Sequence, residues 1–154
     1  MIVDPLISII TPSYFSENHI EDCILSVLSQ TYSNWEMFIV DGESRDSTVQ
    51  IVNQYLQKDD RIKLINNPND DGPAQARAHG LKIANGDYLA FIDSDDLWLP
   101  EKLQSQVEFM VQNNYSFTYT RYRKLMKDNS VTKASSGGHS SNTYCQYLCI
   151  TMDL

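Results

Sequence analysis

The sequence predicts an α/β fold with a mostly parallel sheet flanked by helices, in a three-layer αβα arrangement. Short apolar runs alternate with stretches in which apolar residues recur at helical spacing, and the connections between them are short. Strand–helix–strand connections of this kind are right-handed and place neighbouring strands parallel. Polar clusters also follow three of the predicted strands, at residues 11–14, 41–46 and 93–96. Ligands of open α/β sheets bind outside the carboxyl ends of strands, so we expect the three clusters to face one crevice.

Five segments have the pattern of strands. They are short, nearly continuous apolar runs rich in β-branched and aromatic residues, as expected for strands that are buried on both faces. The predicted strands are residues 6–10, 35–40, 62–65, 88–92 and 117–120. Thr11-Pro12 is expected to close the first strand.

Four segments between these strands have the pattern of helices. Their apolar stripes are Ile20, Ile24, Val27 and Leu28; Val49, Val52, Tyr55 and Leu56; Ala74, Ala78 and Leu81; and Leu103, Val107 and Met110. Asp46 or Ser47 is a suitable N-cap for the second helix. Pro73 suits the first turn of the third helix, predicted at residues 73–84, and Asn85-Gly86 suits its C-terminal end. The fourth helix is predicted from about Pro100 to Asn113.

Composition restricts the class of protein. The 154 residues fit one domain, and the net charge of −8 argues against nucleic-acid binding, which usually requires a basic face. Three scattered cysteines, Cys23, Cys145 and Cys149, favour a reducing compartment over a disulfide framework. The N-terminus lacks the pattern of a signal peptide, and no window holds the ~20 apolar residues of a spanning helix. The expected location is the cytoplasm.

The acid pair Asp93-Ser94-Asp95 is the most specific candidate site. It follows a buried strand, so both carboxylates should lie at the end of the sheet. Mg²⁺ and Mn²⁺ prefer oxygen ligands and keep open positions for phosphates. A bound cation would also stabilise negative charge on a diphosphate leaving group. The alternative interpretation is a pair of loop acids that caps the next helix.

Three further positions are candidates for ligand contact. Asp41, after the second strand, could accept hydrogen bonds from a base N–H or from ribose hydroxyls, or could form a turn with its own backbone. Arg77 could reach a phosphate, or pair with one of the acid clusters as a structural salt bridge. The segment Thr11-Pro12-Ser13-Tyr14 could supply backbone and hydroxyl groups, with Tyr14 stacking on a base, or form a simple turn.

Three other kinds of site are disfavoured. His139, Cys145 and Cys149 match no zinc spacing. Ser44 has no His and Asp partners in the pattern of a hydrolase triad. A nucleotidyltransferase would need a glycine-rich phosphate loop with a lysine near the first strand, and residues 11–19 contain neither residue type.

Taken in order, these motifs resemble family 2 glycosyltransferases. The resemblance runs from about Leu6 to Tyr122, through the segments ISIITPSY, ILSVLSQTYSNWEMFIVDGESRDSTVQIV, DDGPAQARAHGLKIANGDYLAFIDSDDLWLPEKL and FTYTRY. It is strongest to the enzymes that build bacterial surface polysaccharides such as O-antigen, capsule and teichuronic acid. The resemblance implies a GT-A fold over residues 1–123, with 124–154 as a loop and the start of an acceptor-side region.

The same resemblance implies ligands and roles for individual residues. A UDP-, dTDP- or GDP-sugar would be the donor, Mg²⁺ or Mn²⁺ the cofactor, and a saccharide or lipid-linked saccharide the acceptor. Matching by position gives the following roles: Thr11, Pro12, Ser13 and Tyr14 line the base pocket, Asp41 binds the base, Arg77 lies near the base and the diphosphate, and Asp93 lies near the ribose. Ser94 also belongs to the nucleotide-sugar-binding residues, and Asp95, with Asp93, binds the metal.

The chain departs from the family pattern at three places. Gly42 stands where a second acid is common, and Phe15 stands where Asn is usual. The general base of the family, which activates the acceptor for an inverting displacement, is expected beyond the chain end, so no catalytic residue is assigned. The alternative function is therefore a nucleotide-sugar-binding remnant or partner module. The apolar tail 144–154 leaves peripheral association with the inner face of the cytoplasmic membrane, or packing on a second subunit, as open alternatives.

Overall fold

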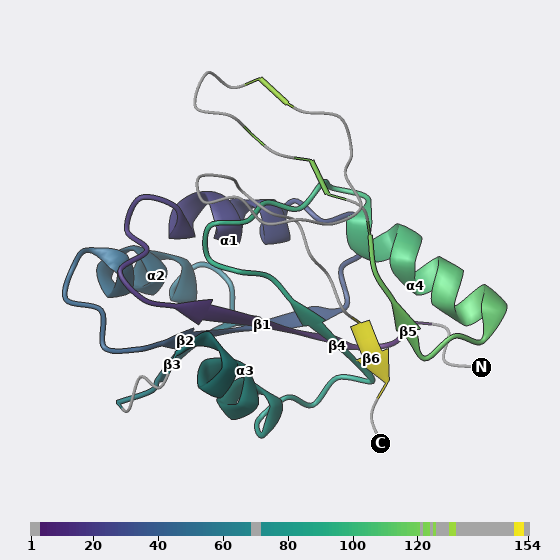
Figure 1. The fold of residues 1–154 in the computed structure, drawn as a ribbon, viewed down its shortest axis with the longest axis horizontal. Coiled ribbons are helices and arrows are strands. Elements are labelled where there is room, and N and C mark those ends of the chain that lie inside the picture. The colour runs from purple at the N-terminus through teal and green to yellow at the C-terminus, as the bar shows by residue number, and fades with distance from the viewer. Residues whose placement is uncertain are drawn as a thin grey trace.

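The computed structural model describes residues 4–68 and 72–120, positions 122, 123, 125, 130 and 131, and the backbone of 150–152. In this part of the chain, six strands form one sheet in the order β3-β2-β1-β4-β6-β5 (Figure 1). The strands are β1 (Ile7–Ser13), β2 (Trp35–Asp41), β3 (Ile62–Asn66), β4 (Tyr88–Phe91), β5 (Phe117–Thr118) and β6 (Ile150–Met152). Neighbours among β1 to β4 are parallel, and β6 is antiparallel to both β4 and β5.

Helices cover both faces of the sheet, which confirms the three-layer prediction. The helices are α1 (Ile20–Leu28), α2 (Thr48–Leu56), α3 (Pro73–Leu81) and α4 (Lys102–Asn113). α1, α2 and α4 contribute to the larger core cluster on one face, and α3 packs on the other face through Ala76 (Figure 1). Among the described residues, no helix is long and apolar enough to cross a membrane.

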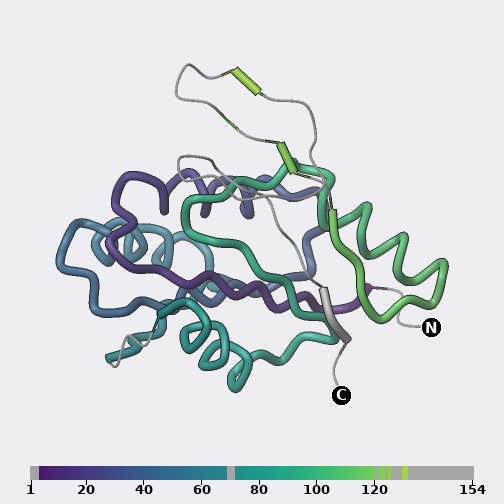
Figure 2. Tube along the Cα trace, in the orientation of Figure 1, coloured from purple at the N-terminus to yellow at the C-terminus, as the bar shows by residue number. Residues whose placement is uncertain are grey.

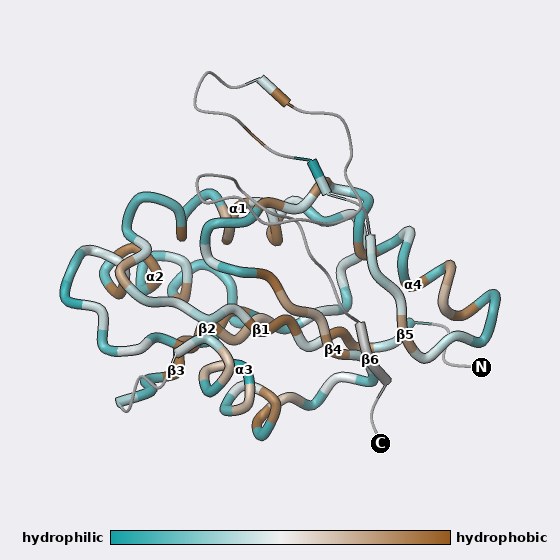
Figure 3. The backbone as a smooth tube through the Cα atoms, viewed as in Figure 1, coloured by the Kyte–Doolittle hydropathy of each residue, from teal (hydrophilic) through white to brown (hydrophobic). Residues whose placement is uncertain are grey.

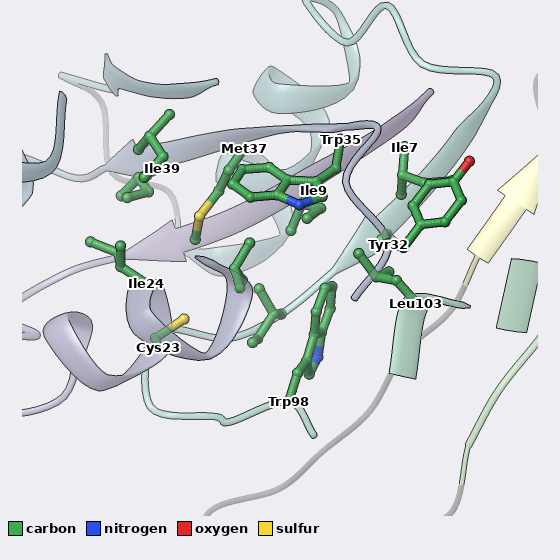
Figure 4. Close-up of a cluster of buried hydrophobic side chains, with 14 of the residues drawn as sticks. Ile7, Ile9, Cys23, Ile24, Tyr32, Trp35, Met37, Ile39, Trp98 and Leu103 are labelled. Carbon is green, nitrogen blue, oxygen red and sulfur yellow. The ribbon is translucent and has the colours of Figure 1, made fainter. Parts of the chain in front are cut away.

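The core follows the alternation of side chains along the central strands. Ile7 and Ile9 of β1 join the larger cluster, whereas Ile10 points to the α3 side. Figure 4 shows Trp35, Met37 and Ile39 of β2 with Ile24 of α1 and Trp98 in the larger cluster. The most apolar stretches of the chain lie along these strands (Figure 3). Both faces of β1 and β2 are thus buried, as their apolar composition predicts.

Several predicted boundaries are wrong. β1 does not end at Thr11-Pro12 but continues to Ser13, because extended backbone suits Pro12 and the pairing with β2 continues. α3 ends at Leu81 rather than 84, and α4 begins at Lys102 rather than Pro100. The fifth strand is shorter than predicted, and β6 was not predicted.

Gly86 is required by close packing and does not end α3, whose C-cap is Lys82. A Cβ atom at Gly86 would lie 2.6 Å from the backbone nitrogen of Ser8 and 2.7 Å from the carbonyl oxygen of Leu6. The Gly86 N–H donates to Ser8 Oγ at 2.8 Å. Glycine therefore lets the connection between α3 and β4 pass directly against β1.

A buried carboxylate joins the same connection to the sheet. Glu36 Oε1 accepts hydrogen bonds from Ser8 Oγ at 2.8 Å and from the Asn85 N–H at 3.0 Å. Lys63 Nζ donates to Glu36 Oε2 at 2.8 Å. Burial alone would raise the pKa of Glu36, but the bonds from Lys63, Asn85 and Ser8 and the charge of Lys63 lower it overall.

Candidate functional site

An offset between the central strands creates the site. β1 pairs with β2 up to Ser13 opposite Asp41, but its pairing with β4 ends at Ile10 opposite Phe91. In the described chain, the last three residues of β1 therefore have a neighbouring strand on one side alone. The strand order also reverses here, since β2 and β3 lie on one side of β1 and β4 on the other. Such switch points are where open α/β sheets bind ligands.

The described residues line two hollows at this edge, and the smaller one lies beside the offset. It has a volume of about 360 Å³ and is lined by Pro12, Ser13, Tyr14, Gly72, Pro73, Ala76, Asp93, Ser94 and Asp95. These residues come from the end of β1, the first turn of α3 and the loop after β4. The acid pair thus faces the N-terminus of a helix, whose partial positive charge favours anions.

The larger hollow lies at the ends of β2 and β3. It has a volume of about 500 Å³ and is lined by Asp41, Glu43, Ser44, Arg45, Val49, Leu64 and Asn66. Two apolar side chains, Val49 and Leu64, form part of its wall, and charged or polar residues form the rest. Such a mixture of apolar surface and a few polar groups is typical of small-molecule sites.

Hydrogen bonds join the three polar loops. The Gly42 N–H donates to the Ser13 carbonyl at 2.9 Å, and the Ser16 N–H donates to Thr48 Oγ1 at 2.8 Å. The hydroxyls of Ser16 and Ser94 lie 2.8 Å apart. Figure 2 shows the trace leaving β1 and β2 at the same end of the sheet. The predicted convergence of the loops is confirmed, but they line two hollows rather than one crevice.

Asp41 is buried and held by one residue. Its side chain accepts two hydrogen bonds from Ser44, from the N–H to Oδ2 at 2.8 Å and from Oγ to Oδ1 at 2.6 Å. Ser44 Oγ in turn accepts the Phe15 N–H at 2.9 Å. Asp41 therefore forms a local turn, which was one of the two roles considered for it from the sequence. It also lines the larger hollow. Ser44, considered from the sequence as a nucleophile alone, links the loops after β1 and β2.

Arg77 forms an ion pair with Asp93. Its Nη2 donates to Asp93 Oδ1, and the two side chains are 32% and 50% exposed. This matches the interpretation in which the guanidinium pairs with an acid cluster, and Arg77 lines neither of the two hollows described above. The other member of the predicted acid pair, Asp95, is exposed at the smaller hollow.

The predicted segment 11–14 divides between core and site. Thr11 is fully buried and lines neither hollow, whereas Pro12, Ser13 and Tyr14 line the smaller one. Tyr14 is 55% exposed and meets Phe15 edge to face, with 4.5 Å between ring centroids. Tyr14 is thus available for stacking, but Thr11 is not placed to touch a ligand in either hollow.

Several residues of the two hollows were not among the candidates from the sequence. Gly72 and Ala76 at the smaller hollow and Glu43, Arg45 and Asn66 at the larger one were not candidates. Gly72, with φ of +88°, allows the chain to turn into α3. The sequence Asn66-Asn67-Pro68 after the third strand could have identified Asn66 as a candidate, because polar residues that follow strands had already identified the other loops.

The acid pair fits a divalent cation that binds together with a phosphate ligand. Asp93 and Asp95 supply hard oxygen donors at the smaller hollow, as Mg²⁺ and Mn²⁺ require. The described residues contain no group of three or more His, Cys, Asp or Glu that could hold a metal by itself. A cation here would therefore take its remaining ligands from phosphate oxygens and water. The three residues considered for a zinc site, His139, Cys145 and Cys149, lie outside the described residues.

Comparison with known proteins identifies the family. The family model described as "Glycosyl transferase family 2" matches residues 8–149, most of the chain. The chain belongs to glycosyl transferase family 2. The resemblance stated from the motifs is therefore confirmed, while the residue roles that it implies are not tested by a family match.

Two curated relatives are similar over most of this chain. The putative teichuronic acid biosynthesis glycosyltransferase TuaG of Bacillus subtilis (strain 168) is 44% identical over 124 residues, which are 80% of this chain and 49% of TuaG. The UDP-Glc:alpha-D-GlcNAc-diphosphoundecaprenol beta-1,3-glucosyltransferase WfgD of Escherichia coli is 45% identical over 128 residues, 83% of this chain and 49% of WfgD. The chain thus spans about half the length of these relatives.

Solved structures of similar proteins confirm the GT-A fold. S. aureus TarS 1–349 in complex with UDP-GlcNAc superposes with a TM-score of 0.68 at 32% identity, covering 72% of this chain and 32% of TarS. The mannosyltransferase PcManGT from Pyrobaculum calidifontis, in complex with GDP-Man and Mn²⁺, has a TM-score of 0.65 at 25% identity, covering 69% of this chain and 32% of PcManGT.

Proposed function

We propose that the chain binds the nucleotide-diphospho-sugar donor of an inverting glycosyltransferase that acts in bacterial surface-polysaccharide synthesis. One observation carries the proposal. At the switch point of a GT-A sheet, two exposed carboxylates share a hollow with the N-terminus of α3. A cation between carboxylates and phosphate, opposite a helix N-terminus, matches the charge of a diphosphate.

Each part of the donor has a place in this proposal. Asp95, with Asp93, holds Mg²⁺ or Mn²⁺ against the diphosphate in the smaller hollow. When bound, the cation supplies stabilisation of the negative charge that develops on the leaving diphosphate. The nucleoside lies beside the smaller hollow, with Tyr14 of its wall available for stacking and Asp41 at the end of the neighbouring strand β2. Arg77 reaches the diphosphate after its ion pair with Asp93 opens.

The relatives support a choice of donor and acceptor to test. WfgD is named for UDP-Glc and a diphosphoundecaprenol acceptor, TarS was solved with UDP-GlcNAc, and PcManGT with GDP-Man and Mn²⁺. We infer a UDP-sugar donor, with dTDP- and GDP-sugars as the alternatives. The acceptor would be a saccharide or lipid-linked saccharide at the inner face of the cytoplasmic membrane.

The test of donor binding is thermal unfolding with UDP, dTDP, GDP and CDP, each with Mn²⁺ or with EDTA. A nucleotide at one hundred times its Kd stabilises the folded chain by about 2.7 kcal/mol. We expect UDP with Mn²⁺ to give the largest shift, and Asp95→Ala to abolish the part that depends on Mn²⁺. Asp60→Asn removes the same charge in the segment between α2 and β3 and should leave the shift intact.

Two outcomes would count against the proposal. A full Mn²⁺-dependent shift in Asp95→Ala would show that the metal site is elsewhere. No shift with any of the four nucleotides would contradict donor binding altogether. A transfer assay with UDP-sugars and a lipid-linked saccharide separates the enzyme from its alternative, because binding without transfer identifies a nucleotide-sugar-binding module.

A further inference from the structure

Ser16 connects two sides of the smaller hollow without lining it. The residue is 6% exposed and lines neither hollow. Its hydroxyl oxygen lies 2.8 Å from the hydroxyl oxygen of Ser94, which is 78 residues away in sequence, and 3.3 Å from the Tyr14 carbonyl oxygen. Tyr14 and Ser94 both line the smaller hollow, one in the loop after β1 and the other in the loop after β4. One buried hydroxyl therefore touches two of the segments that form this hollow.

The two contacts of this hydroxyl fix the direction of its proton. A serine hydroxyl has one proton to donate, and a carbonyl oxygen can only accept. Both contacts are satisfied together when Ser94 donates to Ser16 and Ser16 donates to the Tyr14 carbonyl. The result is a chain of two hydrogen bonds from one loop to the other, and loss of the Ser16 hydroxyl would break both.

The backbone of Ser16 is anchored to two helices. Its N–H donates to Thr48 Oγ1 at 2.8 Å, and Thr48 is the fully buried first residue of α2. Its carbonyl oxygen accepts the N–H groups of His19 and Ile20, each at 2.9 Å, where α1 begins. None of these partners lines a hollow. The position of the Ser16 hydroxyl is therefore set by the helices and does not depend on a ligand.

The hydroxyl pair lies beyond the paired part of β1 and β4. Pairing of these strands ends at Ile10, whose carbonyl oxygen also accepts the Ile92 N–H at 3.2 Å. The loops that follow contain Tyr14 on one side and the acid pair on the other. A hydrogen bond between these loops can therefore set the spacing between two groups that one ligand would contact together.

We propose that Ser16 is a positioning residue that holds the Tyr14 loop and the acid-pair loop at the spacing of a nucleoside diphosphate. The inference rests on the proposed function, in which Tyr14 stacks on the base and the acid pair meets the diphosphate through a cation. Two linked groups gain affinity from their linkage only where the geometry lets both bind at once. Loops that are already held in place also lose less entropy on binding. Ser16 thus affects affinity for the whole donor, and not for either part alone.

The test compares Ser16→Ala with the unaltered chain for three ligands. UDP with Mn²⁺ contacts both loops, pyrophosphate with Mn²⁺ contacts the acid pair alone, and uridine contacts the Tyr14 side alone. Ser16→Ala should bind UDP with Mn²⁺ about fivefold more weakly, the usual effect of one lost neutral hydrogen bond. Pyrophosphate, measured by calorimetry, and uridine, measured by NMR titration without metal, should bind as they bind the unaltered chain. A loss of stability alone would not separate the three ligands in this way.

Three further variants make the comparison specific. Ser26→Ala removes another hydroxyl, which accepts the Trp98 N–H at 3.2 Å and lines neither hollow, and it should bind all three ligands normally. Ser16→Thr keeps the hydroxyl and should restore most of the UDP affinity. Ser16→Cys replaces the hydroxyl by a thiol, a weak hydrogen-bonding group, and should show the alanine pattern even where Ser16→Ala is too unstable to titrate. Thermal unfolding establishes that each variant is folded at the temperature of the titration.

Four results would overturn the inference, and they are distinguishable. Unchanged UDP affinity in Ser16→Ala, with normal binding by the unaltered chain, would overturn the role of Ser16 alone. Equal weakening of UDP and pyrophosphate would also overturn it, because the spacing between two loops does not affect a ligand that contacts one of them. The same losses in Ser26→Ala would show that any lost hydroxyl weakens binding. Failure of the unaltered chain to bind UDP or the other nucleotides would overturn the proposed function and the inference with it.

Discussion

Glu36 shows how one buried side chain can hold distant segments together. Its carboxylate receives hydrogen bonds from Ser8 in β1, from Lys63 in β3 and from the Asn85 backbone before β4. All three donors favour the charged form, and together they outweigh the effect of burial, so the pKa of Glu36 is lowered. The ionised carboxylate is therefore part of the folded structure.

Glu36→Gln should change the pH dependence of stability. A carboxyl group whose folded pKa is lowered contributes stability above its unfolded pKa, and this contribution is lost as the pH falls through the folded pKa. We expect Glu36→Gln to reduce the free energy of unfolding at pH 7 by about 1–3 kcal/mol and to flatten its decline below about pH 4.3. Urea titrations from pH 7 to pH 3 measure both effects.

An exposed acid provides the control for that prediction. Glu108→Gln alters a side chain on the outer surface of α4 that contacts Gln104. It should leave the pH profile unchanged. An identical profile for Glu36→Gln and the unaltered chain would show that the buried network does not stabilise the ionised form.

At the scale of elements, the connection from α3 to β4 depends on a close approach to β1. The position of Gly86 leaves no space for a methyl group beside the backbone of Leu6 and Ser8. Backbone atoms cannot rotate away as a flexible side chain can. Any larger residue must therefore move one segment away from the other.

Gly86→Ala should destabilise the fold without directly altering either hollow. We expect a loss of about 2 kcal/mol in the free energy of unfolding, because crowding forces a backbone shift. The change should appear as a lower urea midpoint with an unchanged slope. Asn85→Ala keeps the backbone N–H that binds Glu36 and should cost much less. Equal midpoints for Gly86→Ala and the unaltered chain would contradict the crowding.

The elements differ in how well local sequence predicts them. β1 to β4 and the four helices follow from apolar runs and stripes, because burial requires these patterns in any fold of this class. The ends of β1 and α3 depend on pairing with β2 and packing against the sheet, which local periodicity does not report. β6 pairs with β4 and β5, which precede it by more than thirty residues, and its sequence was interpreted as an apolar tail alone.

The candidate site was predictable as a region but not as a set of contacts. Polar residues after parallel strands correctly predicted that loops 11–14, 41–46 and 93–96 meet. The pairing of Arg77 with Asp93 and of Ser44 with Asp41 depends on distances across the fold. The left-handed backbone of Glu43 is also imposed by its surroundings, since nothing in a glutamate favours it. Sequence patterns alone therefore could not separate one hollow from two.

At the scale of the whole molecule, charge opposes the proposed ligand. The chain has a net charge of −8, and a nucleoside diphosphate is also an anion. Acidic loops at the end of the sheet add to this repulsion locally. Electrostatic attraction must therefore come from a bound cation, from the helix N-terminus and from Arg77 once its ion pair with Asp93 opens.

Salt should consequently affect UDP binding with opposite signs in two conditions. In EDTA, raising NaCl screens repulsion and should strengthen the weak binding of UDP by a few-fold. With Mn²⁺, the same salt screens an attraction and should weaken binding. Calorimetry at low and high NaCl measures both, and Asp95→Asn should reduce the contrast. If NaCl changed UDP affinity in the same direction with Mn²⁺ and with EDTA, a bound metal would not reverse the local electrostatic field.

The uneven lengths of β1 and β4 also bear on how the chain can change in evolution. Thr11, Pro12 and Ser13 have no residue of β4 beside them, and the smaller hollow lies in the space this leaves. Substitutions that lengthened β4 would extend its pairing with β1 and fill that space. Selection for a more stable sheet and selection for an open ligand site therefore act in opposite directions on the residues that follow Phe91.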